Sequence, residues 1–273
     1  MDGRVLPDRY QWQISRREAR LMERQKADWN DLATVDPLWA ILAEPGKKGR
    51  RWDDRAFFAT GERFFAERLQ PAMTKLSLPR LAGAALDFGC GIGRLTAPIC
   101  GAFDHCLALD IAPRMVDLAR ARANRPPNAT FALLNLQDVL VLADSSFDFI
   151  CCYLVLQHHP KPLLERFVDE LVRLLRPNGL LVLQLPTGIG WCHRLQVRRR
   201  LYRVFRDLGT APGLLYRLGL YPISMYWRSE AWVHARVGKA GGEVCLVEQE
   251  GEGDRENRSI LYYVSKGGET SRQ

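Results

Sequence analysis

The sequence predicts an α/β protein built on a doubly wound, mostly parallel sheet. Between about residues 81 and 190, short apolar stretches alternate with stretches that repeat apolar residues at helical intervals. A glycine-rich turn at residues 89–93 follows the first apolar stretch and precedes a helical pattern. Near the C-terminus, two apolar stretches are separated by a polar, glycine-containing turn. Regular alternation of this kind is typical of parallel strands joined by helical crossovers.

The apolar stretches predict five parallel strands, at residues 84–88, 105–110, 130–134, 147–155 and 180–185. Helical periodicity between them predicts helices at residues 94–103, 113–124 and 163–175. The stretch 147–155 is apolar along its whole length, which predicts a strand buried on both faces. Residues 243–248 and 259–265 predict a hairpin that gives the sheet an antiparallel edge.

Two zones lie outside this alternation. Residues 1–80 carry charged and aromatic side chains at helical intervals, and they predict an N-terminal helical cap. Residues 81–273 predict one Rossmann-like domain, which carries a basic and aromatic helical insertion at about residues 187–237, after the fifth strand. We expect the cap to fold over the site and exclude water, although ordinary packing of its aromatic residues against the sheet is the alternative.

Composition and charge limit the classes of partner and compartment. The formal net charge of +8 favours nucleic acid, anionic lipid or an acidic substrate, although a general preference for arginine gives the same surplus. Seven cysteines without a CxxC spacing indicate reduced thiols and no zinc site. The first 20 residues are charged and lack an apolar leader, and no apolar run has the length of a membrane span. We therefore expect a cytoplasmic protein without a bound metal.

The glycine-rich turn is the clearest candidate for a ligand site. In an open α/β sheet, ligands bind beyond the carboxyl ends of the strands, and glycines let the backbone approach them. Arg94 stands where a dinucleotide-binding motif needs a third glycine, and Asp87 lies two residues before Gly89. A pyrophosphate would repel that carboxylate, whereas an ammonium or sulfonium group would attract it. The alternative is that Asp87 caps a turn or a helix.

A second acid supports a nucleoside ligand. Asp110 ends the second predicted strand, 19 residues after Gly91. A carboxylate at about this interval reaches the ribose of a bound nucleoside and accepts hydrogen bonds from its hydroxyls. The two acids and three glycines, placed within alternating strands and helices, are more specific than any one of these features.

These segments resemble the motifs of class I S-adenosylmethionine (SAM) dependent methyltransferases. Residues 86–96 resemble the family's glycine motif, and residues 109–115 resemble its ribose-binding segment. Similar likenesses to the family's adenine segment and to the approaches to its fourth and fifth strands occur at residues 135–138, 146–150 and 171–179. The resemblance implies a seven-stranded sheet, and it implies that residues 81–273 form a catalytic domain that binds SAM and releases S-adenosylhomocysteine (SAH).

The resemblance also implies a set of cofactor-binding residues. They lie on the glycine loop, at the ends of the strands and in the adenine segment, and they are Asp87, Gly89, Cys90, Gly91, Asp110, Ile111, Met115, Asn135, Leu136, Gln137 and Tyr153. Leu136 stands where the family often has glycine. Which of Asn135, Gln137 and Asp138 would meet the adenine amine is therefore left open.

Catalytic residues are harder to predict, because an activated methyl donor mainly needs to be aligned with its acceptor in a dry pocket. His158 and His159 follow the fourth predicted strand, at the expected mouth of the site, and they are the candidate bases. The alternative is that one of them caps the next helix or orients the loop. The resemblance thus favours methyl transfer to a small-molecule acceptor such as a natural product, a sugar or a lipid-like compound, with RNA methylation or a non-catalytic SAM-binding regulator as alternatives.

A basic amphipathic helix is predicted at residues 194–208. Leu201, Val204, Phe205 and Leu208 share one face, and arginines occupy the others. The pattern fits peripheral membrane contact, RNA phosphate or an acidic substrate. It also fits a helix that covers the acceptor pocket and turns its basic face to solvent.

Overall fold

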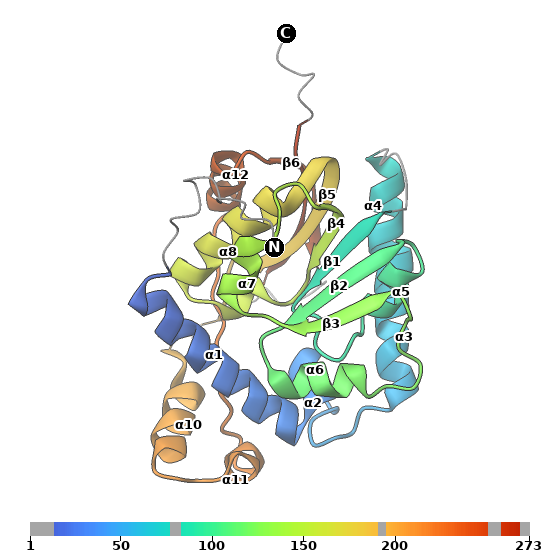
Figure 1. The fold of residues 1–273 in the computed structure, drawn as a ribbon. Helices are drawn as coiled ribbons and strands as arrows, with labels where there is room; N and C mark the ends of the chain where they lie inside the picture. Colours follow the sequence, from blue (N-terminus) through green and yellow to red (C-terminus); the bar gives the residue numbers. More distant parts are fainter. Residues whose placement is uncertain (1–13, 77–82, 191–194, 251–257, 268–273) are drawn as a thin grey trace, which may run out of the picture.

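The computed structural model describes residues 14–76, 83–190, 195–250 and 258–267 (Figure 1). These residues form a seven-stranded sheet in the order β3-β2-β1-β4-β5-β7-β6. The strands are β1 (Ala84–Phe88), β2 (His105–Asp110), β3 (Ala129–Leu133), β4 (Phe147–Cys152), β5 (Leu175–Pro186), β6 (Glu243–Glu250) and β7 (Ser259–Ser265). β7 pairs antiparallel with both β5 and β6, and the other pairs are parallel. The predicted doubly wound, mostly parallel sheet is confirmed.

The order of the strands reverses at β1, which pairs with β2 on one side and β4 on the other. Such a switch point opens a crevice at the carboxyl ends of the strands, because the connections on its two sides run to opposite faces. The loop after β1 and the turn after β4 both begin at this crevice. The fold therefore brings together the two segments that carry most of the predicted site residues, which are the glycine-rich loop and the turn with the two histidines.

Each face of the sheet is covered by its own helices. One face packs against α5 (Thr96–Cys100), α6 (Pro113–Arg120) and the continuous helical segment of α3 (Asp54–Phe64), η2 (Phe65–Leu69) and α4 (Gln70–Lys75). The other face packs against α7 (Leu136–Val141), α8 (Lys161–Leu174) and α12 (Glu230–Lys239). In β5, Leu181 and Leu183 point to the second face and Val182 to the first, and all three are fully buried. Burying one such side chain contributes about 1.5–3 kcal/mol.

The N-terminal helices α1 (Arg16–Val35) and α2 (Pro37–Ile41) lie beside the lower part of the sheet in Figure 1. α1 begins with a capping box, in which the Glu18 amide donates to the Ser15 hydroxyl and the Ser15 amide donates to the Glu18 carboxylate. α2 begins at Asp36, whose side chain accepts hydrogen bonds from three backbone amides. The division of the chain at residue 80 stays a prediction, because α3 and α4 pack directly on the sheet.

The insertion after β5 contains α10 (Val197–Asp207) and α11 (Pro212–Arg217), which form the lowest part of the molecule in Figure 1. The described part of the predicted basic helix is α10. Arg199, Arg203 and Arg206 pair with acids of α1, whereas Arg198, Arg200 and most of the apolar residues are exposed. Paired charges hold much of the helix on α1, and whether the helix covers an acceptor pocket stays a prediction.

Several element boundaries differ from the sequence prediction. The helix after the glycine loop is only Thr96–Cys100, because residues 91–95 form turns. β4 ends at Cys152, and Leu154 then adopts a left-handed φ of 62°. The short helix α7 was not predicted, because its six residues are too few to show periodicity. Within the described ranges, no helix is both long enough and apolar enough to cross a membrane.

Candidate functional site

The loop after β1 is held in place by the carboxylate at the end of β2. Asp110 Oδ2 accepts a hydrogen bond from the Gly91 amide at 2.8 Å, and Oδ1 accepts one from the Ala112 amide at 2.8 Å. The amides of Gly89 and Cys90 also donate to the Leu109 carbonyl, at 2.7 and 2.9 Å. The glycine loop and the start of α6 are thereby fixed around one carboxylate.

Two glycines of this loop are required by their surroundings. Gly91 has a φ of +56°, and a Cβ there would lie 2.5 Å from Ile41 Cδ1 of α2. Gly89 has a φ of +82°, and a Cβ there would lie 2.2 Å from Val155 Cγ2. Side chains at either position would be strained and would also push away a wall of the crevice.

The two acids are buried side by side without a cation at hydrogen-bond distance in the described chain. Asp87 is 3% exposed, and its Oδ2 accepts a hydrogen bond from the Thr96 hydroxyl at 2.6 Å. Burial raises the pKa of Asp87 to about 6, and burial also raises the pKa of Asp110 to about 6. The nearby Arg94 guanidinium opposes the rise at Asp87 but does not cancel it. The crevice therefore presents negative charge that a cationic ligand would stabilise.

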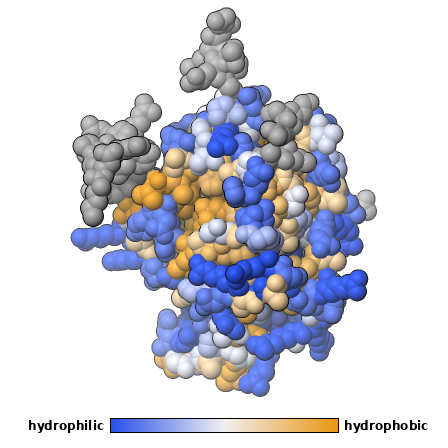
Figure 2. All heavy atoms as spheres, turned by 45° about the vertical axis from the view of Figure 1, so that its right-hand side comes forward, coloured by the Kyte–Doolittle hydropathy of each residue, from blue (hydrophilic) through white to orange (hydrophobic). Residues whose placement is uncertain are grey.

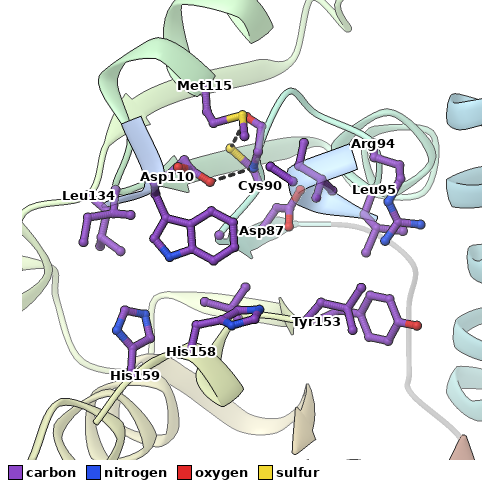
Figure 3. Close-up of a pocket in the computed structure, with 18 residues that line it drawn as sticks. Asp87, Cys90, Arg94, Leu95, Asp110, Met115, Leu134, Tyr153, His158 and His159 are labelled. Atoms are coloured by element: carbon purple, nitrogen blue, oxygen red, sulfur yellow. Dashed lines mark hydrogen bonds between the residues drawn. The ribbon is translucent and has the colours of Figure 1, made fainter. Parts of the chain in front are cut away.

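These groups line a cavity with about 740 Å³ of empty space (Figure 3). Figure 3 shows the loop residues on one side of the cavity and the segment after β4, with Tyr153, His158 and His159, on the other. Of the residues predicted from the sequence, ten line this cavity: Asp87, Gly89, Cys90, Gly91, Asp110, Ile111, Met115, Tyr153, His158 and His159.

The other three predicted residues, Asn135, Leu136 and Gln137, line an adjoining cleft of about 400 Å³. Ile111 and Leu134 line both hollows, so the cleft continues the cavity toward α1. The Leu136 side chain is buried in the core, and the Asn135 amide donates to Asp138 at 2.9 Å. Whether these residues contact a ligand stays a prediction.

The N-terminal helices supply one wall of the cavity. Trp29 of α1 and both Ala40 and Ile41 of α2 line it. The Trp29 ring meets the His158 ring edge to face, with 4.9 Å between the ring centroids. The Gln25 side chain also donates to the His158 carbonyl at 2.8 Å. This arrangement agrees with the expectation of a covering cap, whose effect on cofactor affinity is a matter for experiment.

His158 is engaged at both ring nitrogens. Its Nδ1 lies 2.6 Å from the Ser224 carbonyl oxygen, which can only accept, so Nδ1 carries the proton. Its Nε2 lies 3.2 Å from the amide nitrogen of Gln157, which donates to it. Burial lowers the pKa of His158 to about 4. The geometry favours the structural alternative, in which His158 ties the turn after β4 to the segment after α11.

His159 is buried against the ring of Phe167, at 4.9 Å between centroids. Burial lowers its pKa to about 3, and the neighbouring His158 contributes to the decrease. Its Nδ1 has no hydrogen-bond partner among the described residues. His159 therefore lines the cavity as a neutral side chain, and only a ligand contact would give it a part in proton transfer.

The opposite end of the cavity holds a polar group that the sequence did not mark. The Arg94 side chain is 5% exposed, lies over the Tyr153 ring and donates to the Thr60 hydroxyl. Tyr153 stacks on Phe64, with 4.1 Å between the centroids, and its hydroxyl is hydrogen-bonded to the Glu250 carboxylate. This end of the cavity can therefore orient a polar ligand group.

Sequence reasoning missed several residues of the cavity: Ala40, Ile41, Arg94, Leu95, Leu134, Leu154 and Val155. Leu134 follows β3 directly, so its place at the carboxyl edge of the sheet was a usable signal. The sequence pattern marks Arg94 only as the residue that replaces the third glycine of a dinucleotide-binding motif. Ile41 lies about 50 residues before Gly91 in the chain, and no local pattern connects the two residues.

Comparisons with known proteins agree with this geometry. A family model described as a methyltransferase domain matches residues 86–183. The structure aligns with magnesium protoporphyrin IX methyltransferase from Synechocystis PCC 6803, solved with bound SAH, at a TM-score of 0.60 and 18% identity, over 90% of this chain and 100% of that one. Residues 86–183 therefore match a methyltransferase domain, and the fold is that of the class I SAM-dependent methyltransferases.

Other methyltransferases are similar over part or most of the chain. Ubiquinone biosynthesis O-methyltransferase from Xylella fastidiosa is 33% identical over 103 residues, which are 37% of this chain and 41% of that protein. The chain therefore matches less than half the length of this relative. A SAM-dependent methyltransferase from Leishmania major aligns at a TM-score of 0.59 and 16% identity, over 90% of this chain and 83% of that one. At these identities the structural likeness establishes the fold.

The cavity fits SAM on its own chemistry. Asp87 and Asp110 are buried acids that gain from a cationic ligand, and Asp110 has the position that suits ribose hydroxyls. The Gly89 and Gly91 positions leave room for backbone approach only while they lack a side chain. Apolar groups such as Met115 and Leu134 form the remaining walls, which suits an adenine ring.

Proposed function

We propose that this protein transfers a methyl group from SAM to a small-molecule acceptor. The observation that carries the proposal is one cavity that joins a pair of buried, uncompensated acids to a mostly apolar chamber. The acids match the ammonium, sulfonium and ribose of the cofactor. The chamber gives an organic acceptor a dry surface beside them.

The residues of the cavity divide into two roles under this proposal. Asp110 and the amide-rich loop around Gly91 would hold the nucleoside, and Asp87 would hold the ammonium end of the cofactor. Bound SAM supplies an activated methyl group on a sulfonium, which a nucleophile displaces in line. The protein then mainly needs to orient the acceptor and exclude water, which Trp29, Ile41 and Tyr153 can do from opposite walls.

An acceptor hydroxyl is the nucleophile that we favour. The relatives named above as O-methyltransferases support this choice, as does the apolar chamber, which suits an aromatic or lipid-like compound. The two histidines are neutral and buried, with pKa values lowered by burial, so they are weak bases. A phenol or another acidic hydroxyl loses its proton more readily than an alcohol and therefore depends less on such a base.

An RNA acceptor is disfavoured by the charges of α10. Arg199 and Arg203 donate to Asp28, and Arg206 donates to Asp31. Arginines that are neutralised in this way contribute little to phosphate binding, whose affinity depends on the number of free cations at the interface. Among the described arginines of α10, only Arg198 and Arg200 are left without an acidic partner, which is few for an RNA-binding surface.

The test is incubation of the purified protein with methyl-labelled SAM and extract fractions that separate small polar molecules, lipids and RNA. We expect label in an organic-soluble small molecule, and much less label with the variant Asp110→Asn at a SAM concentration that is limiting for the variant. Asp117→Asn, an exposed change on α6, is the matched control and should label as the wild type does. Label in RNA, or equal labelling by Asp110→Asn, would contradict the proposal.

A further inference from the structure

The exposed apolar side chains of this protein are concentrated in one place. Among the described residues, eleven large apolar side chains are exposed, and eight of them lie between residues 195 and 218. We call these eight the apolar face, and they are Leu195, Val197, Leu201, Val204, Phe205, Leu208, Leu214 and Leu218. Their exposed fractions run from 42% at Phe205 to 76% at Leu208. A concentration of exposed apolar side chains of this kind is unusual on a monomer and indicates an interaction site.

The apolar face is turned outward by specific contacts. Arg203 donates to Asp28 at 2.6 Å, and Arg206 donates to Asp31 at 2.8 Å. The Tyr202 hydroxyl, on the same side of α10, donates to Asp31 at 2.7 Å. Three side chains within one helical turn therefore bind the polar side of α10 to the acids of α1.

This orientation is the reverse of the usual one for a surface helix. An amphipathic helix normally packs its apolar side on the core and leaves its charged side in water. Here Asp28 is 8% exposed and Tyr202 is 2% exposed, while Leu201 and Val204 face solvent. Among the described residues, none covers this exposed side of α10.

The charges beside the apolar face select the partner. Three arginines near the apolar face are exposed: Arg198 and Arg200 on α10, and Arg217 on α11. Helix periodicity puts Arg198 and Arg200 on opposite borders of the apolar side of α10. Figure 2 shows the same mixture at the bottom of the molecule, where apolar patches lie next to hydrophilic side chains. Apolar residues bordered by arginines are the pattern of helices that lie in the surface of anionic bilayers.

We propose that α10 and α11 dock this protein on an anionic lipid bilayer. The leucines, valines and Phe205 enter the boundary between headgroups and acyl chains, and Arg198, Arg200 and Arg217 contact the anionic headgroups. Apolar burial and attraction to anionic headgroups act together in such binding, which is reversible.

The docking surface is connected to the cavity. The Tyr216 hydroxyl of α11 donates to Asp36, which begins α2, and Ile41 at the end of α2 lines the cavity. After α11, Ser224 accepts from the His158 ring and donates to the His158 carbonyl. An acceptor dissolved in the bilayer would thus meet the cavity beside the docked helices. This access route rests on the proposed function, whereas the docking itself does not.

The experiment is co-sedimentation of the purified protein with two kinds of vesicle. One is phosphatidylcholine alone, and the other is phosphatidylcholine with about 30% phosphatidylglycerol. We expect binding to the anionic vesicles at least about 10-fold stronger than to the neutral ones, and weaker in high salt. Leu201→Ser with Phe205→Ser should lower the partition by about 10-fold or more, since two buried side chains are lost. The matched control is Val141→Ser with Val247→Ser, two exposed apolar residues outside the face.

Other outcomes would overturn the proposal. They are equal sedimentation of wild type and the Leu201 and Phe205 variant, or no binding of wild type to anionic vesicles. A concentration-dependent dimer in light scattering that the same variant abolishes would assign the apolar face to a second copy instead. The thermal shift induced by SAM is measured on every variant, because an unchanged shift means that the fold is intact. Loss of that shift in wild type would contradict the proposed function while leaving the docking result valid.

Discussion

Asp110 Oδ2 lies 2.8 Å from the amide nitrogen of Gly91, so the last residue of β2 fixes the loop that follows β1. Because Oδ1 of the same carboxylate accepts from the Ala112 amide, both oxygens already have one partner in the ligand-free chain. Each oxygen keeps a second lone pair, which can accept from a ligand hydroxyl. One side chain thereby orders the loop and keeps acceptor capacity for the ribose that we propose binds there.

Asp110→Asn should weaken SAM binding by about 10- to 100-fold, because hydrogen bonds to a charged group contribute about 1.5–3 kcal/mol. The amide nitrogen of asparagine would also face the Gly91 or Ala112 amide, where only an acceptor fits. Isothermal titration calorimetry measures the change, with Asp117→Asn as the control. An affinity for SAM that stays within 2-fold of wild type would remove Asp110 from the ribose site.

The affinity for SAM should rise with pH through about 6. Burial raises the pKa of both Asp87 and Asp110 to about 6, so both acids are largely protonated at pH 5. A cationic ligand prefers the ionised forms, and each acid that must lose a proton weakens binding about 10-fold at one unit below its pKa. Calorimetry at pH 5, 6, 7 and 8 should find a plateau above pH 7.

The same acids affect folding stability with the opposite sign. A raised pKa means that the folded, ligand-free chain prefers the protonated acid, so this contribution to stability is complete below about pH 4 and is lost as the pH rises through 6. The thermal shift caused by SAM should therefore be larger at pH 7.5 than at pH 5.5. A shift that is independent of pH would mean that the two acids are not exposed to the ligand's charge.

Local patterns were enough for the sheet and for most of the cavity. The glycine loop, the strand-end acids and the turn after β4 each have a sequence signature, because parallel strands bring their carboxyl ends to one edge. The contacts of Ile41 with the glycine loop and of Asp28 with α10 have no such signature, because they join segments that are distant in the chain. The pairing of Arg199, Arg203 and Arg206 with α1 could not be predicted for this reason, since the periodicity of α10 does not include those acids.

The contact between α2 and the glycine loop gives a test of the cap. Gly91→Ala should destabilise the fold by about 1–3 kcal/mol, because alanine is strained at a φ of +56° and its Cβ would overlap Ile41 Cδ1. Ile41→Ala removes the overlap, so the double variant should recover part of the loss in thermal unfolding while SAM affinity stays low. Additive effects of the two changes would mean that α2 does not close on the loop.

The last prediction concerns the two histidines. If neither is the base, kcat at saturating SAM and acceptor should show no ionisation between pH 6 and 7.5, because burial lowers the pKa of His158 to about 4 and that of His159 to about 3. His158→Ala removes the links to Ser224 and Gln157, so it should lower the melting temperature by several degrees, in line with a loss of about 1–3 kcal/mol for a buried hydrogen-bonded group.

His159→Ala, which breaks no described hydrogen bond, is the informative comparison. We expect it to change kcat by less than about 10-fold, which is below the usual contribution of a general base. A decrease of 100-fold or more in kcat, together with loss of a pH-dependent limb and an unchanged melting temperature, would instead make His159 the base. In that case the acceptor would have to bring the Nδ1 atom its missing hydrogen-bond partner, and the pKa of the ring would rise when the acceptor binds.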